Sequence, residues 1–263
     1  MHKFLVRAAS GIVYSAVIIL AIAYGGFSLR LLAMAFAAIG ICELDRMAIG
    51  FSKKTLPLYA LDVLGVLSLV SIALCPYAII LWMVLFLTRT FVANRYHVQN
   101  PESRRIPGYS QVYLGIPFAF MVGDPILRMS LLVFVMLWLN DSGAYIVGST
   151  MGRHKMCPSI SPKKTWEGFI GGVIITLIGT WALWEYGKEF FNMTQFGLGI
   201  WMLLGASTCI FGTLGDLLES KIKRSYGVKD SGNWIPGHGG LLDRIDSFLL
   251  AYPVAVILLS LLS

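Results

Sequence analysis

Charged residues are scarce in this chain, and long polar stretches are few. Only 13% of the 263 residues are Asp, Glu, Lys or Arg, whereas a soluble domain contains about 25%. Apolar residues make up 57%, and the mean hydropathy is +0.73. The composition therefore predicts an all-α, polytopic integral membrane protein, and it leaves no room for a separate soluble domain.

The chain also lacks any cysteine framework. Its four cysteines form no C-x-x-C pair, and three of them lie in or beside apolar runs. We interpret them as small buried hydrophobic residues, so neither a disulfide framework nor a zinc site is predicted. The four are Cys42, Cys75, Cys157 and Cys209.

Long apolar runs recur along the whole sequence and predict about nine transmembrane helices. The first run follows Lys3 and Arg7 and has some features of a signal peptide, but we expect it to be retained because many spans follow. Residues 1–130 are predicted to be N-terminal transmembrane helices, and residues 131–263 a C-terminal transmembrane catalytic region. The runs are 11–26, 28–44, 57–74, 76–93, 109–123, 129–148, 167–184, 196–215 and 247–262.

The net charge of +7 raises the question of a nucleic-acid partner, but the basic residues sit in the loops between apolar runs. We therefore predict no nucleic acid. With nine spans, 17 of the 21 Lys and Arg fall on the side of the N-terminus and three on the other. The positive-inside rule places the N-terminus and the long polar loops in the cytoplasm, and the C-terminus outside. We expect a multi-pass protein of a bacterial-type inner (plasma) membrane.

One polar stretch near the C-terminus, Ser220 to Asp246, stands out from this background. Asp216 precedes it, and Asp243 and Asp246 end it. Carboxylates of this kind hold a hard cation such as Mg²⁺, while Lys and Arg neutralise phosphate oxygens, and glycines let backbone N–H groups approach an anion. The stretch thus predicts a site for a metal ion and phosphate groups. Its basic residues are Lys221, Lys223, Arg224, Lys229 and Arg244.

Helical spacing groups the acidic residues further. Asp216 and Ser220 are four residues apart and share a helical face if the preceding helix continues, and Asp243 and Asp246 are three apart in the next helix. Two helices that flank one loop can then present carboxylates to the same ion.

Other acidic residues lie within or beside the apolar runs. Asp141, in Asn-Asp-Ser-Gly-Ala-Tyr, lies inside a run and has small neighbours that leave room for a substrate. A ligand or metal role is favoured, with a place at a helix end near headgroups as the alternative. Glu43 and Asp45 are interpreted as a water-facing pair at a helix end, and Asp62 as a residue near a membrane interface.

The segment Ser161-Pro-Lys-Lys-Thr-Trp-Glu-Gly168 has the form of a turn that opens a helix, with Thr165 as a possible N-cap. A helix N-terminus and lysines together attract phosphate, so Lys164 is a candidate phosphate ligand. The alternative is a basic cytoplasmic loop that binds no ligand.

These segments resemble the phosphatidate cytidylyltransferase family, also called CDP-diacylglycerol synthases. Ser220-Lys-Ile-Lys-Arg, Pro236-Gly-His-Gly-Gly240 and Asp243-Arg-Ile-Asp246 match the family signature, which spans residues 220–246. Asp141 to Tyr145 and the Ser161 segment agree with it. The resemblance covers roughly residues 138–247 well, whereas the first 130 residues match only as apolar spans.

The resemblance implies a reaction in which CTP and phosphatidic acid give CDP-diacylglycerol and pyrophosphate. It also implies Mg²⁺ and a homodimer. The metal ligands would be Asp216, Asp243 and Asp246, and we expect Asp141 and Asp243 to line one cavity at the cytoplasmic face. The other candidate residues are Asp141, Lys164, Lys223, Arg224, Lys229, His238 and Arg244 for catalysis, and Ser220, Lys221, Gly239 and Gly240 for binding CTP and the metal ion.

His238 could bind phosphate, transfer a proton or organise the loop. The residues themselves leave two other functions open. A related lipid enzyme, such as a polyprenol kinase or a CTP-dependent enzyme of ether lipids, would keep the carboxylates. A transporter with an ion site would spread its charges near the midplane of several spans, whereas here they cluster at the cytoplasmic ends.

Overall fold

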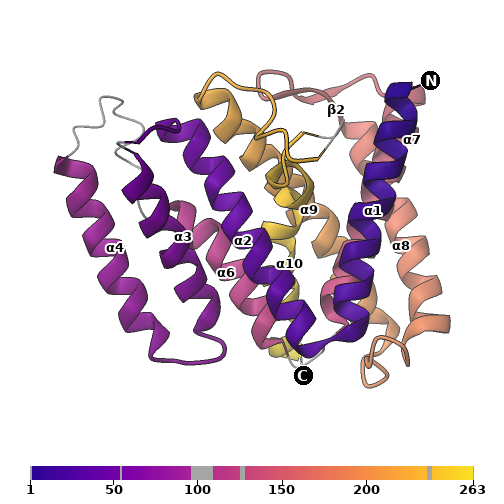
Figure 1. The fold of residues 1–263 in the computed structure, drawn as a ribbon. Helices are drawn as coiled ribbons and strands as arrows, with labels where there is room; N and C mark the ends of the chain where they lie inside the picture. Colours follow the sequence, from indigo (N-terminus) through magenta and orange to yellow (C-terminus); the bar gives the residue numbers. More distant parts are fainter. Residues whose placement is uncertain (1, 54, 96–108, 125–127, 236–238, 263) are drawn as a thin grey trace. The chain divides into compact units, whose positions relative to one another are not determined.

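The computed structural model describes residues 2–53, 55–95, 109–124, 128–235 and 239–262, and helices dominate these residues (Figure 1). Apolar runs become helices in a membrane because each backbone N–H and C=O must be satisfied inside its own segment. The helices are α1 (His2–Tyr24), α2 (Gly26–Ile49), α3 (Leu56–Ser71), α4 (Ala78–Arg95), α6 (Tyr109–Gly123), α7 (Met129–Met151), α8 (Trp166–Gly187), α9 (Leu198–Ser225) and α10 (Leu242–Leu262).

Each of the nine predicted runs falls on one of these helices, so the prediction of an all-α membrane protein is confirmed. Within the described ranges, five helices are long and apolar enough to cross a membrane, namely α2, α7, α8, α9 and α10. Shorter apolar helices cover Ala9–Tyr24, Leu56–Ser71, Ala78–Ala93 and Ser110–Gly123. Gly25 and Gly50, with φ of 61° and 66°, stand at the two ends of α2, where a left-handed backbone is open to glycine.

Two compact units make up the chain. Unit 1 is Met1–Gly123 with Ser225–Ile245, and unit 2 is Asp124–Arg224 with Asp246–Ser263. The predicted division by function near residue 130 stays a prediction.

Unit 1 buries a polar cluster among its apolar helices. Asp62 on α3 is fully buried; its two oxygens accept hydrogen bonds from Arg89 Nε on α4 and Gln111 Nε2 on α6, each at 2.8 Å. Asp45 on α2 is 1% exposed. The prediction of a water-facing Asp45 was therefore wrong, while a position of Asp62 near a membrane interface stays a prediction. A charge in an apolar helix bundle is retained when partners on neighbouring helices bind it, and here Arg89 and Gln111 are those partners of Asp62.

In unit 2, glycines let α7 and α8 pack closely. A Cβ added at Gly172 on α8 would lie 2.6 Å from Asn140 Oδ1 on α7, and one added at Gly143 would lie 3.0 Å from Ile175. Small residues at such an interface are typical of membrane helix pairs. Phe134 on α7 stacks on Phe248 of α10 with ring centroids 4.3 Å apart, which joins a third helix to the pair.

A short hairpin connects α7 to α8. Strands β1 (Lys155–Cys157) and β2 (Ser161–Thr165) pair in antiparallel fashion. The segment at Ser161 was predicted to be a turn, and the structure corrects this to a strand that runs directly into α8. The predicted N-cap is confirmed, because Thr165 Oγ1 accepts a hydrogen bond from Gly168 N at 3.1 Å.

Candidate active site

The polar end of α9 is the starting point of the site. At 28 residues α9 is longer than the roughly 20 residues that cross a membrane, so its last turns extend the helix beyond its apolar part. The predicted sharing of a face is confirmed there, because Ser220 Oγ donates to Asp216 Oδ1 at 3.1 Å. One turn further on, Lys223 pairs with Glu219, at 2.5 Å from Nζ to Oε2.

A lysine from the hairpin reaches this end of α9. Lys164 Nζ lies 2.7 Å from Asp216 Oδ2, and both side chains are about one-quarter to one-third exposed. The two residues are far apart in the sequence, and the pair joins β2 to α9. Lys164 therefore compensates the charge of a carboxylate that the sequence assigned to a metal ion.

The base of the hairpin is held in place by α8. Glu167 in the first turn of α8 accepts hydrogen bonds from the backbone N–H groups of Arg153 and His154 and contacts His154 Nδ1 at 2.5 Å. With the Thr165 cap, these bonds fix both strands at the helix N-terminus. The lysines of β2 consequently have a defined place beside α7 and α9.

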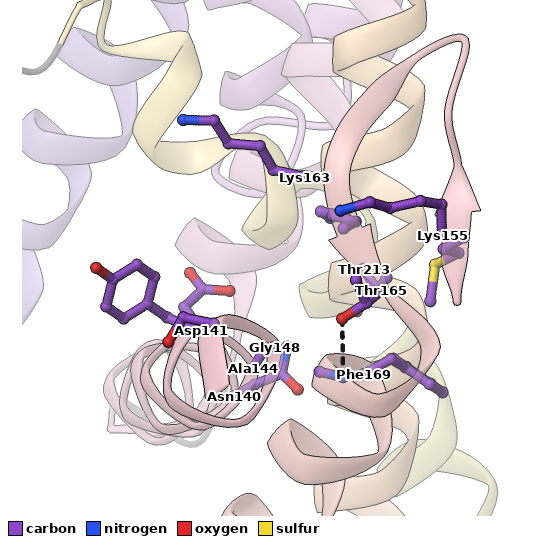
Figure 2. Close-up of a pocket in the computed structure, with 14 residues that line it drawn as sticks. Asn140, Asp141, Ala144, Gly148, Lys155, Lys163, Thr165, Phe169 and Thr213 are labelled. Atoms are coloured by element: carbon purple, nitrogen blue, oxygen red, sulfur yellow. Dashed lines mark hydrogen bonds between the residues drawn. The ribbon is translucent and has the colours of Figure 1, made fainter. Parts of the chain in front are cut away.

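A cavity of about 400 Å³ lies between the hairpin and α7 (Figure 2). Asp141 on α7 borders it, together with Lys155, Lys163 and Lys164 of the hairpin. Figure 2 shows Asp141 projecting from α7 and the side chains of Lys155 and Lys163 coming from the strands. Ala144 and Gly148 on α7 and Gly168 on α8 add little bulk. The cavity thus combines one carboxylate, three ammonium groups and a wall of small residues, which suits phosphate groups.

Asp246 adds a further carboxylate of unit 2. It lies in α10, within electrostatic range of Asp216, Glu219 and Asp141. α9 and α10 approach closely here, because a Cβ added at Gly215 would lie 2.6 Å from the carbonyl oxygen of Asp246. Four acidic residues from three helices therefore gather in one region of unit 2.

These carboxylates match Mg²⁺ in donor type, since that ion is bound through oxygen. Their positions do not yet form a metal site. Among the residues that the structure covers, no three His, Cys, Asp or Glu side chains form a group that could hold a metal ion. Asp216 is instead bound to Lys164 and Ser220. A cation at Asp216 would share the carboxylate with these two partners, because each carboxylate oxygen can accept more than one contact.

Asp243 belongs to unit 1, and its described contacts hold the loop that precedes α10. Its Oδ2 accepts hydrogen bonds from Ser231 N at 3.0 Å and Gly240 N at 2.9 Å. Gly239 has a φ of 88°, and a Cβ there would lie 2.7 Å from Asp243 Oδ2. The geometry of the loop therefore accounts for glycine at positions 239 and 240. Both residues had been predicted to bind CTP and the metal ion. The metal role of Asp243 stays a prediction, as does a common cavity with Asp141, which belongs to the other unit.

The remaining candidates lie at the end of α9 or in unit 1. Lys221, Lys229 and Arg244 are exposed, and Lys223 is 8% exposed and paired with Glu219. Arg224 is exposed at the end of α9. His238 lies outside the described residues. Whether any of these residues contacts a phosphate stays a prediction.

Sequence reasoning did not select Lys155 and Lys163 at the cavity, and it misjudged Glu43. Glu43 was interpreted as water-facing, yet it is 2% exposed and accepts hydrogen bonds from Leu241 N, just before α10, and from Leu242 N, at the first residue of α10. The interpretation was wrong because the end of an apolar run does not reveal which distant segment covers it. A Glu inside the last turns of a strongly apolar helix was the only available signal.

Comparison with known proteins decides the family. The sequence model of the cytidylyltransferase family matches residues 5–262. The chain belongs to this family. The match extends across the N-terminal helices, which the signature segments alone did not reach, and it confirms the prediction of a CTP-dependent nucleotidyltransferase.

Named relatives from staphylococci agree with the family assignment. The phosphatidate cytidylyltransferase of Staphylococcus aureus (strain COL) is 35% identical over 271 residues, which cover 97% of this chain and 98% of that protein. The proteins of the same name from Staphylococcus haemolyticus and Staphylococcus saprophyticus are 47% and 45% identical over 154 residues, and each match covers 57% of this chain and 56% of the relative.

Proposed function

We propose that this cytidylyltransferase is a phosphatidate cytidylyltransferase: it transfers the cytidylyl group of CTP to phosphatidic acid in phospholipid biosynthesis. The observation that carries the proposal is the cavity of unit 2, where Asp141 and three lysines meet at the end of apolar helices. The names of the relatives support the choice of substrates.

The chemistry needs charge neutralisation more than proton transfer. An oxygen of the phosphatidate phosphate, already anionic at neutral pH, attacks the α-phosphorus of CTP. A new P–O bond forms, the bond to the β-phosphate oxygen breaks, and its electron pair leaves with pyrophosphate. The barrier lies in bringing two anions together and in stabilising the leaving group, and Lys and Arg side chains do both by position and charge.

In unit 2, the lysines at the cavity would neutralise the charge of the phosphates. Lys155, Lys163 and Lys164 border it, and Lys164 is held by Asp216 at 2.7 Å. This ion pair orients the Lys164 ammonium group before the substrate arrives, so less side-chain entropy is lost on binding. Asp141 repels excess anion and favours a pose in which the phosphates face the lysines.

Mg²⁺ is part of the proposal, with Asp216, Asp243 and Asp246 as the carboxylates that would bind it. When bound, the ion would supply a positive charge beside the phosphates. The resemblance and the oxygen-rich residue set support it. On the resemblance alone, we also propose that the protein is a homodimer.

The lipid substrate stays in the bilayer, so the cavity has to open to lipid as well as to water. Ala144 and Gly148 on α7 provide a wall with little bulk beside Asp141. We expect a phosphatidate headgroup to enter along this wall at the cytoplasmic face of an inner (plasma) membrane.

Orientation in the membrane yields a testable prediction. The distribution of 17 against three Lys and Arg over alternate loops supports a cytoplasmic N-terminus, and nine spans then put the C-terminus outside. Reporter fusions after Ser263 and within residues 153–164 should report opposite sides of the membrane. Two cytoplasmic signals would rule out the nine-span topology.

The activity itself is tested with purified protein, radiolabelled CTP and phosphatidic acid in detergent micelles. We expect formation of CDP-diacylglycerol that depends on both substrates and on Mg²⁺. A protein that is folded yet consumes no CTP when phosphatidic acid is present would refute the proposed function.

A further inference from the structure

Glu43 is a buried carboxylate that has no role in the proposed reaction. It lies on α2 of unit 1, 2% exposed, close to the end of that helix. A buried charge is costly unless hydrogen bonds compensate it. The partners of Glu43 therefore indicate why a charge is placed there.

Those partners all come from one segment about 190 residues away in the sequence. Glu43 Oε1 accepts a hydrogen bond from Leu241 N at 2.9 Å, and Oε2 accepts one from Leu242 N at 2.8 Å and one from Ser231 Oγ at 2.9 Å. We call residues 226–235 and 239–241, the described part of the connection between α9 and α10, the signature loop. One carboxylate thus binds this loop at Ser231, well inside it, and again where it enters α10.

The loop is shaped around this carboxylate. A Cβ added at Gly232 would lie 2.6 Å from Glu43 Oε1, and one added at Gly240 would lie 2.6 Å from Oε2. A side chain at either position would have to displace the Glu43 carboxylate. The two glycines thus let the backbone of the signature loop come close to Glu43 while its hydrogen bonds stay in place.

The electrostatics favour a carboxylate over any neutral group. The first N–H groups of a helix have no partner within the helix and carry partial positive charge. Glu43 takes the N–H groups of Leu241 and Leu242, and Asp243 takes that of Gly240. Because both Glu43 oxygens accept from backbone N–H groups, an amide at this position would turn an NH₂ group toward another donor.

We propose that Glu43 is a positioning residue for the signature loop: it holds the loop and the start of α10 in the conformation that catalysis requires. It acts through the loop and does not touch the substrates. The proposal rests on the proposed function, because it takes the loop that carries Lys229 and leads to Arg244 as part of the catalytic apparatus.

The test compares Glu43→Gln with Asp62→Asn. Asp62 is also a buried carboxylate of unit 1 that accepts two hydrogen bonds, but from Arg89 and Gln111 rather than from the loop. Asp62→Asn therefore shows how much the loss of a buried charge lowers the stability of unit 1 when the loop is not involved. Ser231→Ala, which removes one of the three bonds to Glu43, provides a milder variant that should fold even if Glu43→Gln does not.

Two readouts are measured on the full-length protein in detergent. In Glu43→Gln we expect kcat/KM for CTP to fall by about tenfold or more, as loss of charge-assisted hydrogen bonds does, with a smaller fall in Ser231→Ala. Hydrogen exchange should accelerate in peptides covering 231–242 and not in α3 or α4. Asp62→Asn should lower the melting temperature and leave loop exchange and KM unchanged.

Unchanged loop exchange in Glu43→Gln and in Ser231→Ala would overturn the proposal. So would an equal loss of kcat/KM in Asp62→Asn at the same loss of melting temperature, because the effect would then be one of stability. A wild-type protein that does not turn over CTP with phosphatidic acid would refute the proposed function instead. The exchange measurement would still decide whether Glu43 holds the loop.

Discussion

Asp246→Asn is expected to lower kcat by about a thousandfold, because it removes a carboxylate proposed to hold the Mg²⁺ that would neutralise the leaving pyrophosphate, and loss of such electrostatic stabilisation has effects of about this size. Asp246 lies in α10 within electrostatic range of Asp216, Glu219 and Asp141. Of these carboxylates, Glu219 is paired with Lys223 and Asp216 with Lys164, and the proposed Mg²⁺ would balance the remaining negative charge. Asparagine keeps the size of the side chain but cannot serve as a carboxylate ligand, so the loss of kcat reports the loss of the carboxylate.

Asp124→Asn is the matched control in the same unit. Asp124 accepts a hydrogen bond from Tyr252 at 2.5 Å and has no assigned part in the reaction. Both variants should elute as folded protein in detergent, and only Asp246→Asn should lose turnover. Near-normal kcat of Asp246→Asn at saturating Mg²⁺ would count against a catalytic carboxylate at this position.

Lys164→Ala is expected to lower kcat/KM for CTP by about a hundredfold, because it removes a cation that borders the cavity. The same substitution leaves Asp216 without its ion-pair partner at 2.7 Å. If substrate phosphate and Asp216 share Lys164, then Asp216→Asn in the Lys164→Ala background should cost much less than it costs in the wild-type protein. Steady-state kinetics of the two single variants and the double variant measure this coupling.

Lys188→Ala serves as the control for lysine removal. Lys188 follows α8, with its ammonium group 4.7 Å from the centroid of the Trp184 ring, and the predicted topology puts it on the side opposite to the hairpin. It should keep wild-type kinetics. If Lys164→Ala also keeps them, the basic hairpin only sets the topology and binds no substrate.

The helices were predictable because a membrane makes one property decisive. A run such as 129–148 has to form a helix to satisfy its backbone in lipid, and α7 covers Met129–Met151. The hairpin was not predicted, since β1 and β2 are only three and five residues long. Strands of this length are too short for an alternation of apolar and polar residues to distinguish them from a turn.

Within the candidate site, the sequence predicted the shared helical face of Asp216 and Ser220 and the grouping of Asp141, Asp216 and Asp246, but it missed the ion pair and the hydrogen bonds between elements. The spacing of Asp216 and Ser220 predicted their shared face, because both lie on one helix. The pairing of Lys164 with Asp216 and the binding of the signature loop by Glu43 depend on tertiary packing. The residues involved are about 50 and nearly 200 positions apart in the sequence. Helical periodicity contains no information about contacts between residues that are so far apart in the sequence.

The fate of each CTP phosphate tests the central claim most directly. Purified protein is given phosphatidic acid and CTP labelled at either the α- or the γ-phosphate, and lipid is separated from water-soluble products. Transfer of a cytidylyl group predicts that the α-label enters the lipid as CDP-diacylglycerol and the γ-label is released as pyrophosphate. Appearance of the γ-label in the lipid would identify a lipid kinase and contradict the account.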